Sequence, residues 1–290
     1  MKTTLCTLYN SLYLDKGLVL FDSLKECASD FELYVLCMDD KCYEVLSDIG
    51  DDRLKPIPLK DVENEAMLVA KANRGMAEYC WTCSSRFIQY ILETFNTANC
   101  TYIDADMYFF HDPQVLLDEM IASGKSVTMV PHRFTPAYEY LQPKVGKYCV
   151  EFNSFLNNEK GLEVLTHWHN KCLECCKNIG DGIHWGDQKY LDEWTTLFPE
   201  AVHECEHLGA GIAPWNIEWY KDYLGADYSV VFKKTNERVK AVFYHYQSVS
   251  YLTRKEINTG VSNNPNIDRG VVYGFYYDYL KQLDEKKSFL

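Results

Sequence analysis

Two carboxylates one residue apart, Asp104 and Asp106, are the clearest candidates for chemistry in the sequence. They end the apolar run 100–103, and the aromatic run 108–110 follows them closely. On a strand, both side chains would point to the same side, where they repel each other unless a cation joins them. A hard divalent cation fits this need and leaves coordination positions open for phosphate oxygens. The alternative is a solvated loop, but a bare loop would not lie between two hydrophobic runs.

A second class of enzyme uses the same short motif. Haloacid-dehalogenase-like phosphatases carry Asp-x-Asp at a strand end, and their first aspartate is the nucleophile. Their pair usually lies near the N-terminus and is followed by Thr or Val. Here about a hundred residues precede Asp104, and Met107 and Tyr108 follow Asp106. A phosphatase is therefore the weaker alternative.

Alternating strand and helix patterns lead up to this pair. The predicted strands are 3–9, 31–38, 100–103 and 126–130, with a Pro-containing edge segment at 55–59, and the predicted helices are 16–28, 43–47 and 78–95. This alternation predicts a mostly parallel sheet that is covered on both faces. Ligands bind beyond the C-terminal ends of such strands, where Asn10, Asp39 and Asp104 fall.

The second half of the chain has a less regular pattern. After about residue 150, Trp, His and Tyr are frequent, and we interpret this half as the second wall of a cleft. The final stretch, 271–290, predicts a helix with several aromatic side chains. We expect its aromatic face to pack on the body of the protein. The alternative is weak membrane-surface attachment, aided by Lys281, Lys286 and Lys287.

Composition limits the possible functions. The chain has 290 residues, 47% of them hydrophobic, which is enough for a sizeable core. A net charge of -13 argues against nucleic-acid binding, because the protein repels phosphate. An anionic ligand therefore needs a local cation or a helix N-terminus. No stretch approaches a membrane span, and polar residues interrupt 5–21 too often for a signal peptide, so we expect a cytoplasmic protein.

The 12 cysteines predict reduced, mostly buried thiols, because such usage in a long intracellular chain differs from a disulfide scaffold. Two pairs have the spacing of metal ligands, Cys80 with Cys83 and Cys172 with Cys175. Both fall in helical patterns, where this spacing places two small apolar side chains on one face. We therefore favour buried thiols over a zinc site.

Several motifs occur in the order in which one enzyme family carries them, and they span most of the chain. They are Thr-Leu-Tyr-Asn at 7–10, Tyr13, Lys-Gly at 16–17, Arg86, Tyr-Ile-Asp-Ala-Asp at 102–106, Phe-Asn-Ser at 152–154, Gly-Asp-Gln at 186–188 and Tyr-His-Tyr at 244–246. On these motifs the chain resembles the glycogenin-like glycosyltransferases and their bacterial galactosyl- and glucosyltransferase relatives.

The resemblance implies the GT-A fold, an α/β architecture in which a Rossmann-like, mostly parallel sheet flanked by helices merges with a smaller acceptor-binding half. One domain of residues 1–290 is expected, with a nucleotide-binding half at about 1–150 and a donor-sugar and acceptor half at about 151–290. The implied reaction transfers a hexose from a nucleoside diphosphate sugar, with UDP-hexose favoured, to a saccharide or other hydroxyl acceptor with retention of configuration. A nucleotide-sugar or carbohydrate-binding protein without turnover is the alternative.

The resemblance also implies roles for individual residues. Asp104, Asp106 and His245 would bind Mn²⁺ or Mg²⁺, and the imidazole favours Mn²⁺. Asp187 and Gln188 would be the catalytic pair that orients the donor sugar, a carboxylate beside a bifunctional amide. Substrate contacts are assigned to Thr7, Tyr9, Asn10, Tyr13, Asp39, Arg86, Ala105, Asn153 and Asn216.

Purely structural roles compete with these assignments at several positions. Asp187 would cap a following helix, and Arg86 would form a salt bridge within its own helix. At other positions the structural alternatives are a capped turn at Tyr9 and Asn10, a solvated turn at Asp39, and a surface pair at His132 and Arg133.

The chain departs from the family after the metal histidine. In the family, a Gly and a Lys-Pro-Trp follow that histidine and help to hold the diphosphate, whereas here Gln247 and Ser248 follow His245. Either Arg254 or Lys255 supplies the missing positive charge, or the metal carries more of it.

Two histidines compete for the third metal position. His207 lies shortly before a Pro-Trp at 214–215, which echoes the family's string, with Ala213 in place of the lysine. His245 ends an apolar, strand-like run, 239–244, so a rigid element would deliver its ring into the cleft. We therefore prefer His245.

Overall fold

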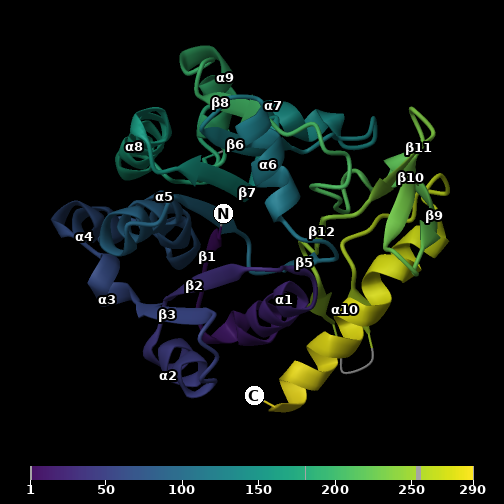
Figure 1. The fold of residues 1–290 in the computed structure, drawn as a ribbon, viewed down its shortest axis with the longest axis horizontal. Helices are drawn as coiled ribbons and strands as arrows, with labels where there is room; N and C mark the ends of the chain where they lie inside the picture. The colour runs from purple at the N-terminus through teal and green to yellow at the C-terminus, as the bar shows by residue number, and fades with distance from the viewer. Residues whose placement is uncertain (1, 180, 253–255, 290) are drawn as a thin grey trace.

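A seven-stranded sheet forms the centre of the computed structural model, which describes residues 2–179, 181–252 and 256–289 (Figure 1). The strand order is β3-β2-β1-β4-β7-β6-β8. Every paired strand is parallel to its neighbour except β7, which runs antiparallel to β4 and β6. The predicted mostly parallel α/β sheet is therefore confirmed. The strands are β1 Thr3–Tyr9, β2 Phe31–Cys37, β3 Leu54–Pro58, β4 Asn99–Ile103, β6 Val127–Pro131, β7 Tyr148–Leu156 and β8 Val202–Glu204.

Helices cover both faces of this sheet. Residues of α3, α4, α5, α8 and α9 pack over one face, and residues of α1, α2 and α6 pack over the other. The helices, including the short 3-10 helices labelled η, are η1 Ser11–Tyr13, α1 Leu14–Cys27, α2 Asp40–Asp48, α3 Leu59–Val62, α4 Glu65–Lys71, α5 Met76–Phe95, α6 Gln114–Ala122, η2 Glu139–Leu141, α7 Gln142–Val145, α8 Glu159–Glu174, η3 Lys189–Glu193, α9 Trp194–Leu197, η4 Ile217–Trp219 and α10 Arg269–Phe289.

Side-chain caps define where several helices begin. Asn158 accepts a hydrogen bond from the Gly161 amide at 2.9 Å and starts α8. Asn64 caps α4 in the same way through the Met67 amide, also at 2.9 Å. These side chains satisfy backbone donors that have no partner within the helix.

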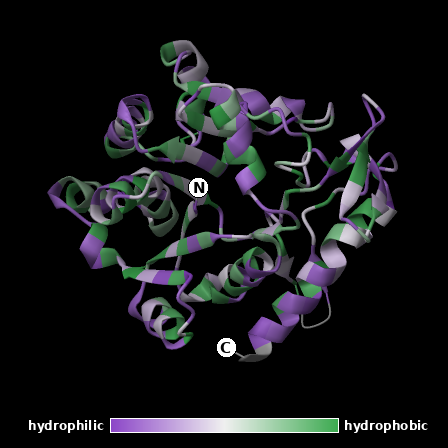
Figure 2. Ribbon diagram, viewed as in Figure 1, coloured by the Kyte–Doolittle hydropathy of each residue, from purple (hydrophilic) through white to green (hydrophobic). Residues whose placement is uncertain are grey.

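The inner strand β1, third in the order of the main sheet, explains why two layers of helices are needed. All of its residues are buried. Because side chains alternate across a strand, Cys6 and Leu8 join the core beneath α5 and α8, whereas Leu5 and Tyr9 join the core beneath α1. In Figure 2, hydrophobic residues are concentrated on the strands and inner helix faces, whereas the outer helix α2 and the C-terminal turns of α10 are largely hydrophilic.

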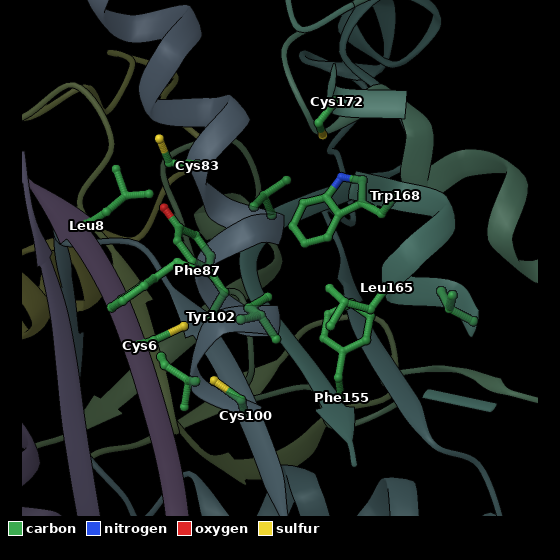
Figure 3. Close-up of a cluster of buried hydrophobic side chains, with 14 of the residues drawn as sticks. Cys6, Leu8, Cys83, Phe87, Cys100, Tyr102, Phe155, Leu165, Trp168 and Cys172 are labelled. Carbon is green, nitrogen blue, oxygen red and sulfur yellow. The ribbon is translucent and has the colours of Figure 1, made fainter. Parts of the chain in front are cut away.

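One of these cores holds α8 against the sheet. In Figure 3, Cys83 and Phe87 of α5 approach the same cluster as Leu165 and Trp168 of α8. Trp168 is fully buried, and its ring stacks on Phe155 of β7 with a centroid distance of 6.0 Å. The Trp168 indole therefore fixes α8 relative to the strand that carries part of the site described below.

The C-terminal part of the chain adds a second set of elements beside the main sheet. A small antiparallel sheet, β11-β10-β9, lies next to α10, which also packs against α1 (Figure 1). Strand β12 pairs antiparallel with β5, and β13 pairs with β14. These strands are β5 Met107–Phe109, β9 Tyr220–Leu224, β10 Ser229–Phe232, β11 Glu237–Lys240, β12 Phe243–His245, β13 Ser250–Tyr251 and β14 Ile257–Asn258.

The aromatic face of α10 packs on the body of the protein, as the sequence predicted. Phe275, Tyr276 and Tyr279 are buried, whereas Tyr273 and Tyr277 are exposed. No helix in the described ranges combines the length and apolarity that a membrane span requires.

The structure differs from the sequence-based expectations in three places. Residues 104–106 form a turn between β4 and β5 and not the end of a strand, because the chain leaves the main sheet there to pair with β12. The run 239–244 is divided between β11 and β12. The part beyond residue 150 is more than a second wall, because most of β7 and all of β8 belong to the main sheet.

We predict that position 17 in α1 must be glycine, because the ring of Tyr9 fills the space that a side chain would need. A Cβ atom at Gly17 would overlap that ring, which is 4% exposed and confined in the core. Gly17→Ala gains up to about 1 kcal/mol of helix propensity, but overpacking costs about 1–3 kcal/mol. We therefore expect a net loss in the free energy of unfolding, measured by urea denaturation. Gly225→Ala is the control, because its Cβ would lie 3.7 Å from the nearest atom, and an equal loss there would contradict the explanation.

Candidate active site

A cleft of about 590 Å³ opens beyond the C-terminal ends of β1 and β4. Most of the predicted site residues line it, although they come from separate segments of the chain. They are Tyr9, Asn10, Tyr13, Asp104, Ala105, Asp106, Asp187, Gln188 and His245. A larger groove of about 820 Å³ lies beyond Phe134, which lines both spaces. Two ion pairs lie along it, Lys147 with Glu204 at 2.6 Å and Lys189 with Asp192 at 2.8 Å.

A compact group of possible metal ligands lies in the cleft. The β5–β12 ladder places Met107 opposite His245, so the imidazole meets the turn that carries the two aspartates. His245 Nε2 lies 3.1 Å from Asp106 Oδ1 and 3.7 Å from Asp104 Oδ2. One ligand atom from each of the three residues lies within 4.8 Å of the others. Two hard carboxylate oxygens and one imidazole nitrogen are a donor set that suits Mn²⁺, and Mg²⁺ less well.

Glu151 of β7 is a member of this site that the sequence reasoning missed. The residue is fully buried, and its Oε2 lies 2.6 Å from Nδ1 of His245. Its other carboxylate oxygen has no hydrogen-bond partner among the described residues. The available signal was a single charged residue within the otherwise uncharged strand 148–156, because a charge in a buried strand requires a partner.

Several buried carboxylates lie close together in the cleft, and burial and neighbouring charges shift their pKa values. Burial raises the pKa of Asp104 to about 6, and Asp106 adds to the rise while His245 opposes it. Burial acts in the same direction on Asp106, but His245 and then Lys16 lower the pKa of Asp106 below its usual value. Burial alone would lower the pKa of His245, yet Asp106 and Glu151 raise it well above the usual range. The His245 imidazole therefore lies between carboxylates that favour positive charge at this position.

Few cations oppose these carboxylates. Lys16 Nζ lies 3.8 Å from Asp106 Oδ2. Within the described part of the chain, no lysine or arginine lines the cleft. Arg254 and Lys255, which were expected to contact the diphosphate, lie outside the described residues.

Asp187 and Gln188 reach the cleft from the segment after α8. Asp187 is 4% exposed, and its Oδ2 has no hydrogen-bond partner within the part of the chain that the structure describes. Burial raises the pKa of Asp187 to about 7, although a hydrogen bond from Ser84 opposes the rise. Trp168 holds the segment by donating from Nε1 to the Asp187 carbonyl oxygen at 2.9 Å. The helix-cap alternative for Asp187 is wrong, because η3 begins at Lys189 without a side-chain cap.

Gln188 is held by backbone groups. Its Nε2 donates to the Val145 carbonyl oxygen at 2.8 Å, and its Oε1 accepts from the Val150 amide at 3.4 Å. The amide therefore has a fixed orientation at the cleft wall, between α7 and β7.

The loop after β1 combines structural and cleft-facing roles. Asn10 Oδ1 accepts from the Leu12 amide at 3.1 Å and caps η1, while the residue also lines the cleft. Tyr13 is 44% exposed, and the Lys16 ammonium lies 4.3 Å from the centre of its ring. Asp39 does not line the cleft; its carboxylate accepts from the Ser11 amide and hydroxyl, both at 2.9 Å, and also caps α2.

Four further residues that were predicted to contact substrate lie outside the cleft lining. Thr7 is fully buried. Arg86 pairs with Glu93 of its own helix at 3.0 Å, as its structural interpretation predicts. Asn153 is fully buried and donates to the Val150 carbonyl at 3.1 Å. Asn216 uses both of its polar atoms, accepting from Ala213 and donating to His132 and Gly211.

His132 lines the cleft, and His207 does not. The pKa of His132 is lowered to about 4, chiefly by burial, so its imidazole is neutral near pH 7. Its ring stacks on Phe134 with a centroid distance of 4.5 Å. His207 accepts from the Gly209 amide at 3.1 Å and belongs to neither group of possible metal ligands among the described residues.

The cysteines are free thiols, and most of them are buried. The two groups with metal-ligand geometry in the described ranges are the one formed by Asp104, Asp106 and His245 and a buried one formed by Cys149, Glu151 and His245. Neither contains the cysteine pairs that have metal-like spacing in the sequence. The prediction of reduced, mostly buried thiols is confirmed.

Two relatives resemble the chain over most of its length. The uncharacterized protein YfnD of Bacillus subtilis is 30% identical over 255 residues, covering 87% of this chain and 79% of YfnD. The uncharacterized protein YfnF of the same organism is 28% identical over 288 residues, covering 98% of this chain and 93% of YfnF. No model of a protein family matches the chain.

Several solved glycosyltransferases share the fold. An active-site mutant of LgtC aligns with a TM-score of 0.60 at 10% identity, covering 98% of this chain and 96% of that one. The galactosyltransferase LgtC in complex with donor and acceptor sugar analogs gives 0.57 at 13% identity, with coverages of 84% and 87%. Mouse xyloside xylosyltransferase 1 gives 0.54 at 14% identity, with coverages of 85% and 98%. The predicted GT-A fold is confirmed by these likenesses.

The buried carboxyl of Asp187 is predicted to make stability depend on pH. The pKa of Asp187 is raised to about 7 in the folded protein, mainly by burial, so the folded state keeps a proton that the unfolded chain releases near pH 4. Stability therefore falls as pH rises between these values. Asp187→Asn removes this loss, so its advantage in the free energy of unfolding should grow from about pH 5 to about pH 7.5. Urea unfolding in chelator measures this difference.

The control for this experiment is Asp52→Asn, because Asp52 is exposed in the folded protein. Its difference from the wild type should stay constant over the same pH range. An Asp187→Asn advantage that is equal at both pH values would contradict the burial explanation.

Proposed function

The chain belongs to the same family as YfnD of Bacillus subtilis and has the GT-A fold, and on this premise we propose that it is a metal-dependent glycosyltransferase. It moves a hexose from a nucleoside diphosphate sugar, with UDP-hexose the favoured donor, to a hydroxyl group of a saccharide or another acceptor. The motifs on which the chain resembles the glycogenin-like enzymes support retention of configuration as part of this proposal.

The excess of negative charge in the cleft is the observation that best supports this proposal. Asp104, Asp106 and Asp187 face a space that no lysine or arginine of the described residues lines. A bare diphosphate in that space would be repelled both locally and by the net charge of -13. A divalent cation held by the two adjacent aspartates and His245 reverses the local sign and can bind phosphate oxygens.

Each part of the site has a proposed task. Asp104, Asp106 and His245 hold Mn²⁺, which would stabilise the charge that develops on the leaving diphosphate. Asp187 accepts hydrogen bonds from donor-sugar hydroxyls, which would supply the partner that its Oδ2 lacks. Gln188 fixes the orientation of that sugar through an amide whose position the backbone sets.

The structure argues against a phosphatase, whereas a binding protein without turnover can be distinguished from the proposed enzyme only by an activity measurement. A haloacid-dehalogenase-like phosphatase uses the first aspartate as a nucleophile, but Asp104 lies in a turn within a GT-A fold and beside His245. A nucleotide-sugar-binding protein without turnover would have the same metal site and the same ligand affinity. Only turnover of the donor distinguishes that protein from an enzyme.

The first test is the metal dependence of nucleotide binding and donor turnover. UDP should raise the melting temperature clearly with Mn²⁺ and only weakly in excess chelator, because the cleft repels a bare diphosphate. Asp106→Asn should lose most of this metal dependence, since a carboxylate ligand becomes neutral. UDP-hexose should be hydrolysed slowly with Mn²⁺ present, and the measurement is UDP release.

The possible outcomes separate the proposals. Equal stabilisation by UDP with and without metal would refute the metal bridge. Metal-dependent UDP binding without any turnover of UDP-hexose, with a panel of sugar acceptors added, would favour the binding protein.

A second test compares the two histidines. His245→Ala should raise the Mn²⁺ concentration needed for UDP stabilisation strongly, because one of the three protein ligands is lost. His207→Ala should leave this requirement unchanged, because His207 does not line the cleft. A thermal-shift titration with Mn²⁺ at constant UDP measures both variants. The reverse pattern would place the metal elsewhere.

A further inference from the structure

We propose that Glu151 is a positioning residue that orients His245 for metal binding and joins the two parts of the metal site. The inference rests on the proposed metal-dependent function, because the metal's ligands are the groups that Glu151 contacts. Glu151 is not itself a ligand in this arrangement. It bonds to the imidazole nitrogen opposite the one that approaches the two aspartates.

Glu151 contacts both parts of the site from one position on β7. Its carbonyl oxygen accepts a hydrogen bond from the Asp104 amide at 3.2 Å. Its Oε2 lies 2.6 Å from His245 Nδ1. Asp104 and His245 lie 141 positions apart in the sequence, and this single residue bonds to each of them.

The contact with Nδ1 decides which nitrogen can bind a metal. When Nδ1–H donates to a carboxylate, Nε2 keeps its lone pair and the ring orientation is set. Nε2 is the nitrogen that lies 3.1 Å from Asp106 and 3.7 Å from Asp104. The Glu151 carboxylate therefore selects the form of the imidazole that can share a cation with the two aspartates.

The burial of Glu151 needs a compensating interaction of this kind. The residue is fully buried, and its Oε1 has no hydrogen-bond partner in the described ranges. Burying it therefore costs more free energy than burying an apolar residue of the same size. No other residue of β7 is charged. The bond to His245 compensates part of that cost, which indicates that the role of the carboxylate concerns that histidine.

The surrounding chain leaves space for this carboxylate. Gly211 has a φ of +72°, and a Cβ atom there would lie 2.8 Å from Glu151 Oε1 and 2.6 Å from Val130 Cγ1. Only glycine combines that backbone conformation with the required space. Gly211 therefore belongs to the packing that holds Glu151 against His245.

A different role would place a metal between Cys149, Glu151 and His245, whose ligand atoms are also close enough to share one. Two observations oppose this arrangement. Burial raises the pKa of the Cys149 thiol well above its usual value, whereas a metal ligand must be the thiolate. All three residues are buried, so a metal there would have little room for a phosphate oxygen.

The test measures Mn²⁺ affinity directly, through the electron paramagnetic resonance signal of free Mn²⁺ during titration with protein in the presence of UDP. Glu151→Ala should weaken Mn²⁺ binding by about 10–100-fold, as is typical when the carboxylate partner of a ligating histidine is removed. Glu151→Gln should show a smaller but clear loss, because its amide oxygen still accepts from Nδ1. High Mn²⁺ should restore UDP stabilisation in Glu151→Gln.

Glu119→Gln is the matched control. Glu119 Oε1 lies 2.6 Å from His203 Nε2, which is the same kind of contact at the same distance, but neither residue lines the cleft. This variant should bind Mn²⁺ as the wild type does. Cys149→Ser should also keep its Mn²⁺ affinity, and a large loss there would place the metal on the buried side of His245.

The outcomes distinguish this inference from the proposed function. A wild-type protein that does not bind Mn²⁺ with UDP would overturn both. Wild-type binding together with unchanged affinity in Glu151→Gln and Glu151→Ala would overturn only the role of Glu151. If Glu151→Ala fails to fold, the comparison of Glu151→Gln with Glu119→Gln decides the result, because both variants keep the side-chain volume.

Discussion

The short antiparallel ladder between β5 and β12 is the constraint on which the site depends. It pairs Met107 with His245, and the ladder continues through the Tyr246 amide, which donates to the Asp106 carbonyl oxygen at 2.8 Å. A backbone ladder fixes register to one residue, and a slip by one would turn the imidazole to the opposite face. The aromatic core around Tyr244 and the helix α10 packs behind β12. The C-terminal part of the chain thereby supplies both the histidine and the support that holds it.

The same constraint brings carboxylates together at an electrostatic cost. Burial raises the pKa of Asp104 and of Asp187, which means that ionising them in the folded protein is unfavourable. His245 lies between Asp106 and Glu151, and its attraction to these carboxylates relieves part of the cost. A cation and a nucleotide would relieve more, so that their binding would stabilise the fold. This electrostatic cost is one reason for the proposal that the cleft binds a metal together with a diphosphate.

Some side chains that stabilise the fold also form the cleft or hold the segments that line it. Asn10 caps η1 while it faces the cleft, and Asp39 ties the loop after β1 to the start of α2. Trp168 fills the core beneath α8 and also bonds to the backbone at Asp187. Such sharing is expected where the ends of buried strands meet a ligand, because rigid elements position functional groups more accurately than free loops do.

The sequence by itself determined the alternating α/β pattern, the GT-A resemblance and the motif at Asp104 and Asp106, because hydrophobic periodicity and short motifs are local properties of the chain. It also led to the assignment of His245, through the order of the motifs. Only the tertiary structure decided that Glu151 lies behind that histidine and that Arg86 and Asn216 are used in internal contacts. The reason is that a side chain's partner depends on how distant strands are paired, and neither residue type nor spacing specifies which long-range neighbour will lie within bonding distance.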